Sequence, residues 1–324
     1  MPTIRITPIG FESLGVRSMC TFVETPDVRV LIDAGVALGP RFGKLPHPKE
    51  YVARNLCRAK IREYAAKADV IVVSHYHNDH HTPNYTETVY VGCSAGESEQ
   101  IYRDKTVLAK DIRNSINFSQ RRRGWMFQQF IKRIGSKCEI ADGKTFEYGS
   151  TRVKFSQPVP HGEEESELGW VLMTTVESGD SRFLHASDVQ GPISNQTTRT
   201  ILKENPDLLI LGGPPLYLEG LKVDRVAIDR ALDNAARIAV KVPTLIFEHH
   251  LLRSEDWRER AKKVWDAVTE VSHAVTIASE YLGEPLQLLE AARPRLYEEE
   301  PPSEEFMKWS KMKREKQRIQ LPPI

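Results

Sequence analysis

The sequence predicts an α/β fold in which a sandwich of β-sheets carries helices on its outside. Short β-branched segments separated by turn residues fill the first third of the chain, and strands alternate with helices from about residue 196 onward. A run of strands followed by such alternation is typical of layered sheets covered by helices. With 324 residues, 40% of them hydrophobic, the chain can bury the large core that this architecture needs.

The first expected elements are three strands, a helix and a fourth strand. Strands are predicted at 3–9, 19–24 and 28–35, where apolar residues alternate with polar ones or β-branched residues cluster between turns. Residues 49–67 place Ala, Leu, Ile and Tyr on one stripe, which predicts an amphipathic helix. The apolar strand expected at 69–74 runs directly into a group of histidines.

The second half of the chain predicts a hairpin followed by β/α units. Residues 168–176 and 181–186 are expected to pair as strands around the turn sequence SGDS at 178–181. The other elements expected here are strands at 151–156, 207–211 and 243–248, and helices at 223–239 and 255–270.

The composition indicates how the chain is organised and what kinds of partner its charge can attract. Residues 1–292 are predicted to form one domain with a basic and aromatic insertion at about 97–150, followed by a polar tail at 293–324 that is exposed or loosely docked. The net charge of +1 provides no global field for nucleic acid or membrane, so any electrostatic attraction must be local.

The cysteines and the apolar runs indicate a cytoplasmic protein without membrane contact. The four cysteines lie far apart and form no C-x-x-C pair, which fits a reducing compartment and excludes a cysteine zinc knuckle. No apolar run approaches 18 residues, and the N-terminus lacks the apolar core of a signal peptide. The sequence predicts no oligomeric state.

Residues 74–81 read SHYHNDHH and hold four of the ten histidines. His75 and His77 follow the predicted strand, and residues two apart in extended chain project to the same side. Asp79 and His80 come next, where the chain must turn, and can point to a second ion. A polar loop would explain one histidine, but four ligand-type residues spaced H-x-H-x-D-H predict a metal site. Imidazole and carboxylate together suit zinc, iron or manganese.

This pattern resembles the signature of the metallo-β-lactamase fold hydrolases, and in particular an archaeal branch of predicted metal-dependent hydrolases without an assigned substrate. Over roughly residues 3–280 the other motifs of that family follow in order: Asp33 in VLIDAG, His161 in FSQPVPHG, Asp188 in RFLHASDVQG, and His249 or His250 in TLIFEHHLL. The resemblance implies an αββα sandwich with a metal site along one edge.

The resemblance also implies two divalent metal ions, zinc by preference, with iron or manganese as alternatives. The implied ligands are His75, His77 and His161 for one ion, Asp79, His80 and His250 for the other, and Asp188 as a bridge between them. His250 is preferred over His249 because HLL fits the family's late motif better than HHL. His249 would then pack or act as a general acid, and Asp33 would orient a ligand or the loop through hydrogen bonds.

The chemistry implied is hydrolysis by a hydroxide that two cations activate, with Asp79 taking its proton. The leading substrate class is a phosphodiester or another small phosphate-bearing molecule. Carboxylic esters, lactones and thioesters are alternatives, as is thiol oxygenation at a single iron. A non-catalytic binding module is a further alternative, which the intact ligand set argues against. The segment LGGPPLYLEG at 211–220 is expected to line the edge of the cleft, with Tyr217 as a candidate substrate contact.

A basic segment at 103–137 allows a nucleic-acid partner. It holds ten basic residues against two acidic ones. A phosphate clamp beside base-stacking aromatic rings would be formed by Arg121, Arg122 and Arg123 with Trp125 and Phe127. The alternative is an ordinary helix, because apolar residues from Phe127 to Ile134 fall at the spacing of a core-facing stripe with basic residues on its wet side.

Overall fold

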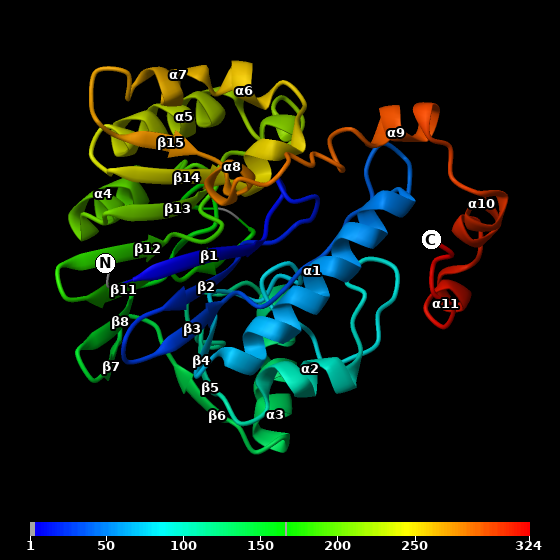
Figure 1. Cartoon of the computed structure of the whole chain (residues 1–324), viewed down its shortest axis with the longest axis horizontal. Helices are drawn as coiled ribbons and strands as arrows, with labels where there is room; N and C mark the ends of the chain where they lie inside the picture. The colour runs from blue at the N-terminus through cyan, green and yellow to red at the C-terminus, as the bar shows by residue number, and fades with distance from the viewer. Residues whose placement is uncertain (1–3, 166) are drawn as a thin grey trace.

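The structure, a computed structural model, describes residues 4–165 and 167–324. Two sheets pack face to face, and helices cover both outer faces (Figure 1). The first sheet has the strand order β1-β2-β3-β4-β5-β6, in which β1 to β3 are antiparallel and β3 to β6 are parallel. Its strands are β1 (Arg5–Gly10), β2 (Cys20–Glu24), β3 (Arg29–Ile32), β4 (Val70–Val73), β5 (Thr106–Ala109) and β6 (Lys137–Ile140).

The second sheet has the order β15-β14-β13-β12-β11-β8-β7 and is parallel from β12 to β15. Its strands are β7 (Thr145–Tyr148), β8 (Thr151–Phe155), β11 (Thr174–Ser178), β12 (Ser181–His185), β13 (Leu208–Gly212), β14 (Thr244–Glu248) and β15 (Ala274–Thr276). A separate ribbon pairs β9 (Val159–Pro160) with β10 (Trp170–Val171).

Helices flank each sheet. On the first sheet lie α1 (Pro48–Lys67), α2 (Ala95–Tyr102) and α3 (Phe118–Arg133), and on the second lie α4 (Asn195–Glu204), α5 (Arg225–Ala239), α6 (Trp257–Arg260) and α7 (Lys262–Asp266) (Figure 1). The remaining helical elements are η1 (Leu216–Leu218), η2 (His249–Arg253), α8 (Ala278–Leu282), α9 (Arg293–Glu299), α10 (Glu304–Ser310) and α11 (Arg314–Gln317). Among the described residues, none of these helices is both long and apolar enough to cross a bilayer.

The strands are apolar on both faces because both faces are buried. In β4, Val70 and Val72 join the core between the sheets, whereas Ile71 and Val73 join the core under the helices. In β14, Ile246 faces the inner core and its two neighbours face the helices. Successive side chains of a strand point to opposite faces, so a strand with a helix layer on one side and a sheet on the other reads as a continuous apolar run.

The elements expected from the sequence lie within a few residues of those observed, with four differences. Residue 3 of the first expected strand lies outside the described residues. The strand expected at 168–176 is two short strands, β10 and β11, and the helix expected at 255–270 is divided at Ala261 into α6 and α7. The segment at 97–150 is no insertion: β5 and β6 extend the first sheet in parallel, and α3 packs Phe127 and Phe130 into its outer core.

The C-terminal segment is docked, so the expectation of an exposed or loosely docked tail is wrong. Phe306 and Trp309 of α10 are buried and pack edge-on against Tyr51 of α1. Arg293 donates from two nitrogens to the two oxygens of Glu50, each at 2.8 Å, in a fully buried pair. Figure 1 shows α9 to α11 extending beside one end of α1. Two aromatic anchors and a buried ion pair therefore hold this segment, and further ion pairs such as Lys49–Glu300 and Arg314–Glu87 lie nearer the surface.

Candidate metal centre

The candidate site lies where several strands end at one edge of the sandwich. Parallel strands bring their carboxyl ends to the same edge of a sheet. Asp33 follows β3, His75 follows β4, Asp188 follows β12 and His249 follows β14. His161 directly follows β9 in the small ribbon. Segments far apart in the sequence thus bring imidazoles and carboxylates together on rigid strand ends.

The first group of possible ligands comprises His75, His77, His161 and Asp188. One ligand atom from each lies within 4.8 Å of all the others. His75 Nε2 is 3.1 Å from His77 Nδ1, and His161 Nε2 is 2.9 Å from Asp188 Oδ2. Burial, together with the neighbouring imidazoles, holds the pKa values of His75 and His77 well below their ordinary range. Neutral imidazoles with available lone pairs are the form that binds a cation.

The second group comprises Asp79, His80 and His249, whose ligand atoms also lie within 4.8 Å of one another. The rings of His80 and His249 are 5.2 Å apart, and His249 Nε2 is 3.9 Å from Asp79 Oδ2. Asp188 connects the two groups, because its Oδ2 lies 2.9 Å from His161 and 3.2 Å from His249. This carboxylate therefore lies between the two groups.

The donor set fits divalent cations. His80 Nε2 and Asp188 Oδ1 are buried and have no hydrogen-bond partner among the described residues. Buried polar atoms without a partner are costly and uncommon, so each calls for an explanation. A cation between the groups would satisfy both atoms. Imidazole nitrogen and carboxylate oxygen are ligands for zinc, iron and manganese, so the residues can bind a metal without specifying which one.

Asp33 fixes the orientation of His80. Its carboxylate accepts hydrogen bonds from the Ser74 amide (2.8 Å) and hydroxyl (2.6 Å), and it lies 2.8 Å from His80 Nδ1. Burial opposes ionisation, but the His80 contact and charge hold the pKa of Asp33 below its ordinary value. With Nδ1 held by a carboxylate, Nε2 of His80 is the nitrogen that would remain to bind a cation. The structure therefore gives Asp33 the orienting contact that the sequence indicates.

The glycine of the VLIDAG motif has a steric role. A Cβ atom on Gly35 would lie 2.3 Å from the backbone nitrogen of His81 and 2.6 Å from the carbonyl carbon of His80. Such contacts are far inside van der Waals distance, and the atoms met belong to backbone that cannot swing away. Gly35 therefore allows the loop that carries His80 to lie directly against the end of β3, beside Asp33.

The paired histidines depart from the sequence-based assignment. Both histidines form a possible ligand group with Asp188, but among the described residues only His249 also joins Asp79 and His80, so the geometry favours His249 for the second group. The sequence argument assumed extended chain, in which neighbours point to opposite sides. Instead β14 ends at Glu248, and His249 has a φ of 63°, in the left-handed region. This turn lets both histidines reach Asp188 Oδ2, at 3.2 Å and 3.1 Å.

His250 belongs to a hydrogen-bonded series that ends at Asp188. Its Nδ1 lies 2.9 Å from the hydroxyl of Tyr217, and that hydroxyl accepts from Arg253 at 3.2 Å. The Tyr217 and His250 rings are nearly parallel, with an angle of 13° between them. Burial and the nearby Arg253 lower the pKa of His250 to about 4. A neutral His250 can accept a hydrogen bond from the Tyr217 hydroxyl at Nδ1 and donate one from Nε2 to Asp188.

The comparisons with known proteins place the chain in a family. No model of a known protein family matches it. Its sequence is 42% identical over 298 residues to the UPF0282 protein of Methanopyrus kandleri, covering 92% of this chain and 100% of that protein. The chain belongs to the UPF0282 family. The UPF0282 protein of Korarchaeum cryptofilum is 40% identical over 306 residues, covering 94% of this chain and 98% of that one.

A solved structure confirms the fold expected for this UPF0282 chain. The metallo-β-lactamase fold protein YhfI from Bacillus subtilis superposes with a TM-score of 0.52, covering 85% of this chain and 95% of that one. The sequence identity is 17%, so the likeness shows the fold alone. The resemblance to metallo-β-lactamase fold proteins, and to archaeal relatives in particular, is confirmed.

Glu12 and Arg253 also reach the candidate centre of the UPF0282 chain, and neither is predicted from the sequence. Glu12 lies in the loop after β1, 3.0 Å from His249 Nδ1, and it also accepts from Arg253 at 2.6 Å. Burial alone would lower the pKa of His249, but Glu12 and Asp188 hold it well above its ordinary range. No sequence signal marks Glu12, because its loop carries a single acidic residue without a ligand-type neighbour.

The site opens into a cleft of about 640 Å³. The residues of the two groups that face it are His77, Asp79, His161 and Asp188. Arg17, Tyr217, His250 and Arg253 form part of its wall, and Glu163 and Glu167 also line it. A volume of this size suits a small molecule, or one unit of a larger one. Tyr217 thus lies at the cleft, as the sequence indicates.

The three consecutive arginines are divided between two environments. Arg123 turns inward, and its Nε donates to the carbonyl oxygen of Tyr76 at 2.5 Å. Arg121 and Arg122 are exposed beside Phe118 and Trp125, around a shallow pocket of about 570 Å³. Phe127 is buried in the core under the helices and cannot stack on a base. Of the residues predicted to form a clamp, Arg121, Arg122 and Trp125 therefore lie together at the surface beside Phe118, whereas Arg123 supports the histidine loop.

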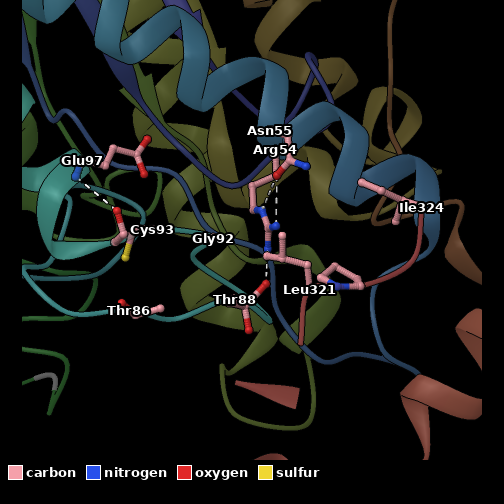
Figure 2. A pocket seen from close by; sticks show the side chains of 11 residues that line it. Arg54, Asn55, Thr86, Thr88, Gly92, Cys93, Glu97, Leu321 and Ile324 are labelled. Carbon is pink, nitrogen blue, oxygen red and sulfur yellow. Dashed lines mark hydrogen bonds between the residues drawn. The ribbon is translucent and has the colours of Figure 1, made fainter. Parts of the chain in front are cut away.

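A further cavity of about 390 Å³ lies between α1 and the C-terminal segment (Figure 2). Arg54 donates to the carbonyl oxygen of Thr88 at 3.0 Å and to the side chain of Asn55 at 3.0 Å, while Leu321 and Ile324 form the other side. None of the residues that line it belongs to the histidine and aspartate groups. This cavity therefore lies outside the candidate centre.

Proposed function

We propose that the chain is a hydrolase whose centre holds two divalent cations. The observation that carries this proposal is the position of Asp188, which contacts ligand candidates of both groups. A carboxylate can join two cations, whereas a neutral imidazole offers one lone pair. The proposed ligands are His75, His77 and His161 on one side of Asp188 and Asp79, His80 and His249 on the other.

When bound, two cations in such a centre supply a water of lowered pKa (towards ~7) and positive charge that stabilises an anionic transition state. The residues of the chain orient the ligands and set their charge. Asp33 and Glu12 orient His80 and His249. Although burial opposes ionisation, His80, His249 and Arg253 hold the pKa of Asp79 far below its ordinary value. Its carboxylate therefore stays anionic, which is the form that binds a cation.

The leading substrate class is a small phosphate-bearing ester, with carboxylic esters, lactones and thioesters as alternatives. The test uses the purified full-length chain, its metal content determined by elemental analysis, and one substrate of each class. Hydrolysis that is lost on chelation and restored by zinc, iron or manganese is expected. Hydrolysis that survives chelation would refute the proposal. One iron per chain together with thiol oxidation would favour the oxygenase alternative.

A second candidate substrate is single-stranded nucleic acid, and the exposed aromatic residues of α3 favour it. Phe118 is 82% exposed and Trp125 is 55% exposed, beside Arg121 and Arg122. Stacking of bases on aromatic rings with arginines along the backbone is a common way of binding single strands. Asn117, which caps α3, donates to the backbone oxygen of Glu167 at 2.7 Å, so this face adjoins the cleft. Fluorescence anisotropy with a labelled oligonucleotide tests this candidate.

A further inference from the structure

Two arginines and a tyrosine line one wall of the cleft, and a third arginine packs on the ring of that tyrosine. Arg17, Arg253 and Tyr217 line the cleft. The guanidinium carbon of Arg41 lies 4.4 Å from the centre of the Tyr217 ring, and an Arg41 Nη1 also donates to the carbonyl oxygen of Arg253. Three guanidinium groups are therefore packed together beside the candidate metal centre.

Two carboxylates are hydrogen-bonded to two of these arginines. Glu290 accepts from Arg17 at 2.5 Å and 2.7 Å, and Glu12 accepts from Arg253 at 2.6 Å and 2.8 Å. A third carboxylate, Asp79, lies 3.8 Å from Arg253. Arg41 approaches Glu290 only at 3.8 Å, so it is the arginine whose charge is compensated least closely.

The Arg41 charge is poorly solvated and only partly bonded. The Arg41 side chain is 16% exposed, and its Nε and Nη2 donate no hydrogen bond to any residue that the structure describes. Within the same described ranges, Arg17 Nη1 also donates none. Burial lowers the pKa of Arg41, although Glu290 and Tyr217 oppose this effect. A largely buried charge whose carboxylate partner lies at 3.8 Å is weakly compensated, and a bound anion would compensate it further.

We propose that Arg17 and Arg41, with Tyr217, form an anion subsite that takes a phosphate or carboxylate group of the substrate. Phosphate and carboxylate are the groups that the planar guanidinium recognises with paired hydrogen bonds. Glu163 and Glu167, which line the cleft as well, disfavour a second anionic group beside them. The subsite would orient the substrate over the histidines and aspartates. The subsite rests on the proposed function only in that the bound molecule would be hydrolysed at the metal centre.

Gly39 offers a way to disturb this subsite without removing a charge. A Cβ on Gly39 would lie 2.2 Å from Arg17 Nη1 and 2.3 Å from its Cζ. The clash is with the end of a side chain, so Gly39→Ala would displace the Arg17 guanidinium and leave the backbone in place. Arg41→Gln removes the Arg41 charge and keeps Glu290 paired with Arg17. The two variants therefore test position and charge separately.

The experiment is calorimetric titration of the full-length chain after chelation and dialysis, with inorganic phosphate and with acetate as probes. Wild-type protein is expected to bind one of these anions, and Arg41→Gln and Gly39→Ala are expected to bind it at least tenfold more weakly. Arg5→Gln is the matched control, because Arg5 is 79% exposed on β1. Preference for phosphate or acetate identifies the group that the subsite takes. Circular dichroism confirms that each variant is folded.

Three results would overturn the subsite: no binding of either anion to the wild type, equal binding by Arg41→Gln and Gly39→Ala, or equal weakening by Arg5→Gln. Because the titration uses metal-free protein, its outcome does not depend on whether the centre binds metal or hydrolyses anything. A failed subsite would leave the proposed hydrolase in place, and an inactive metal centre would leave the subsite in place.

Discussion

Glu12 and His249 are separated by 237 positions in the sequence, and Glu12 Oε2 lies 3.0 Å from His249 Nδ1. Both side chains are buried at the edge where β1 and β14 end. The contact fixes which nitrogen of His249 is presented to Asp188 and Asp79. It repeats, on the second sheet, the relation between Asp33 and His80 on the first. Each of the two histidines proposed for the second cation, His80 and His249, thus has a carboxylate next to its Nδ1.

Glu12→Gln is expected to weaken metal binding while preserving the fold. The amide keeps the shape of the side chain but removes the negative charge that supports His249 and pairs with Arg253. Loss of such a supporting carboxylate typically costs 10- to 100-fold in metal affinity. Competition with a chromophoric chelator measures this affinity, and Glu305→Gln, at an exposed position, serves as the control. Unchanged affinity in Glu12→Gln would remove Glu12 from the site.

His249→Ala and His250→Ala are expected to differ in metal content. His249 joins Asp79 and His80, so its loss should empty or weaken one metal site. His250 lies between Tyr217 and Asp188, so its loss should leave the metal content close to that of the wild type. If His250 delivers a proton during turnover, the rate should fall about 10²- to 10⁴-fold. Elemental analysis of both variants side by side decides, and the reverse pattern would assign the ligand to His250.

Replacing Arg121 and Arg122 together with glutamine tests the nucleic-acid candidate. If both contact phosphates of a single strand, the slope of log affinity against log salt should flatten by about 1.4. Anisotropy with a labelled oligonucleotide at several salt concentrations measures it. The control is the double variant Arg5→Gln and Lys308→Gln, which removes two other exposed charges. Equal slopes in the wild type and the α3 variant would leave these arginines as ordinary surface residues.

Trp309→Ala is expected to lower the free energy of unfolding by about 3–5 kcal/mol, the range for truncating a buried aromatic side chain. Trp309 is 1% exposed and packs against Tyr51. Urea unfolding followed by circular dichroism measures the change. Ile319→Ala, at a residue 88% exposed, should change stability by less than about 0.5 kcal/mol. A neutral Trp309→Ala would mean that the C-terminal segment is not docked in solution.

Local pattern was sufficient for the buried strands and for most of the residues that meet at the candidate centre. The apolar run Val70–Val73 followed by H-x-H-x-D-H identifies both the strand and the residues that β4 carries to the edge. The geometry favours His249 where the sequence favoured His250, because the sequence argument assumed extended chain where the backbone turns left-handed. The alternation of side chains along a strand does not determine the direction of a side chain that follows the end of the strand.

Other features depend on contacts that no local pattern encodes. Glu12 reaches the site only because β1 and β14 end at the same edge. The docking of Phe306 and Trp309 depends on Tyr51, more than 250 positions earlier in the chain. The short strands β5 and β6 lie within a segment whose basic charge dominates its composition, although their parallel pairing with β4 makes them part of the first sheet.

The central claim is a centre of two cations joined by Asp188, and metal stoichiometry tests it most directly. The measurement is elemental analysis of the wild type and of Asp188→Ala, after both have been loaded with zinc and desalted, with circular dichroism to confirm folding. We predict two equivalents per chain in the wild type and at most one in Asp188→Ala, because two cations would repel each other without the carboxylate between them. Two equivalents in the variant, or none in the wild type, would contradict the claim.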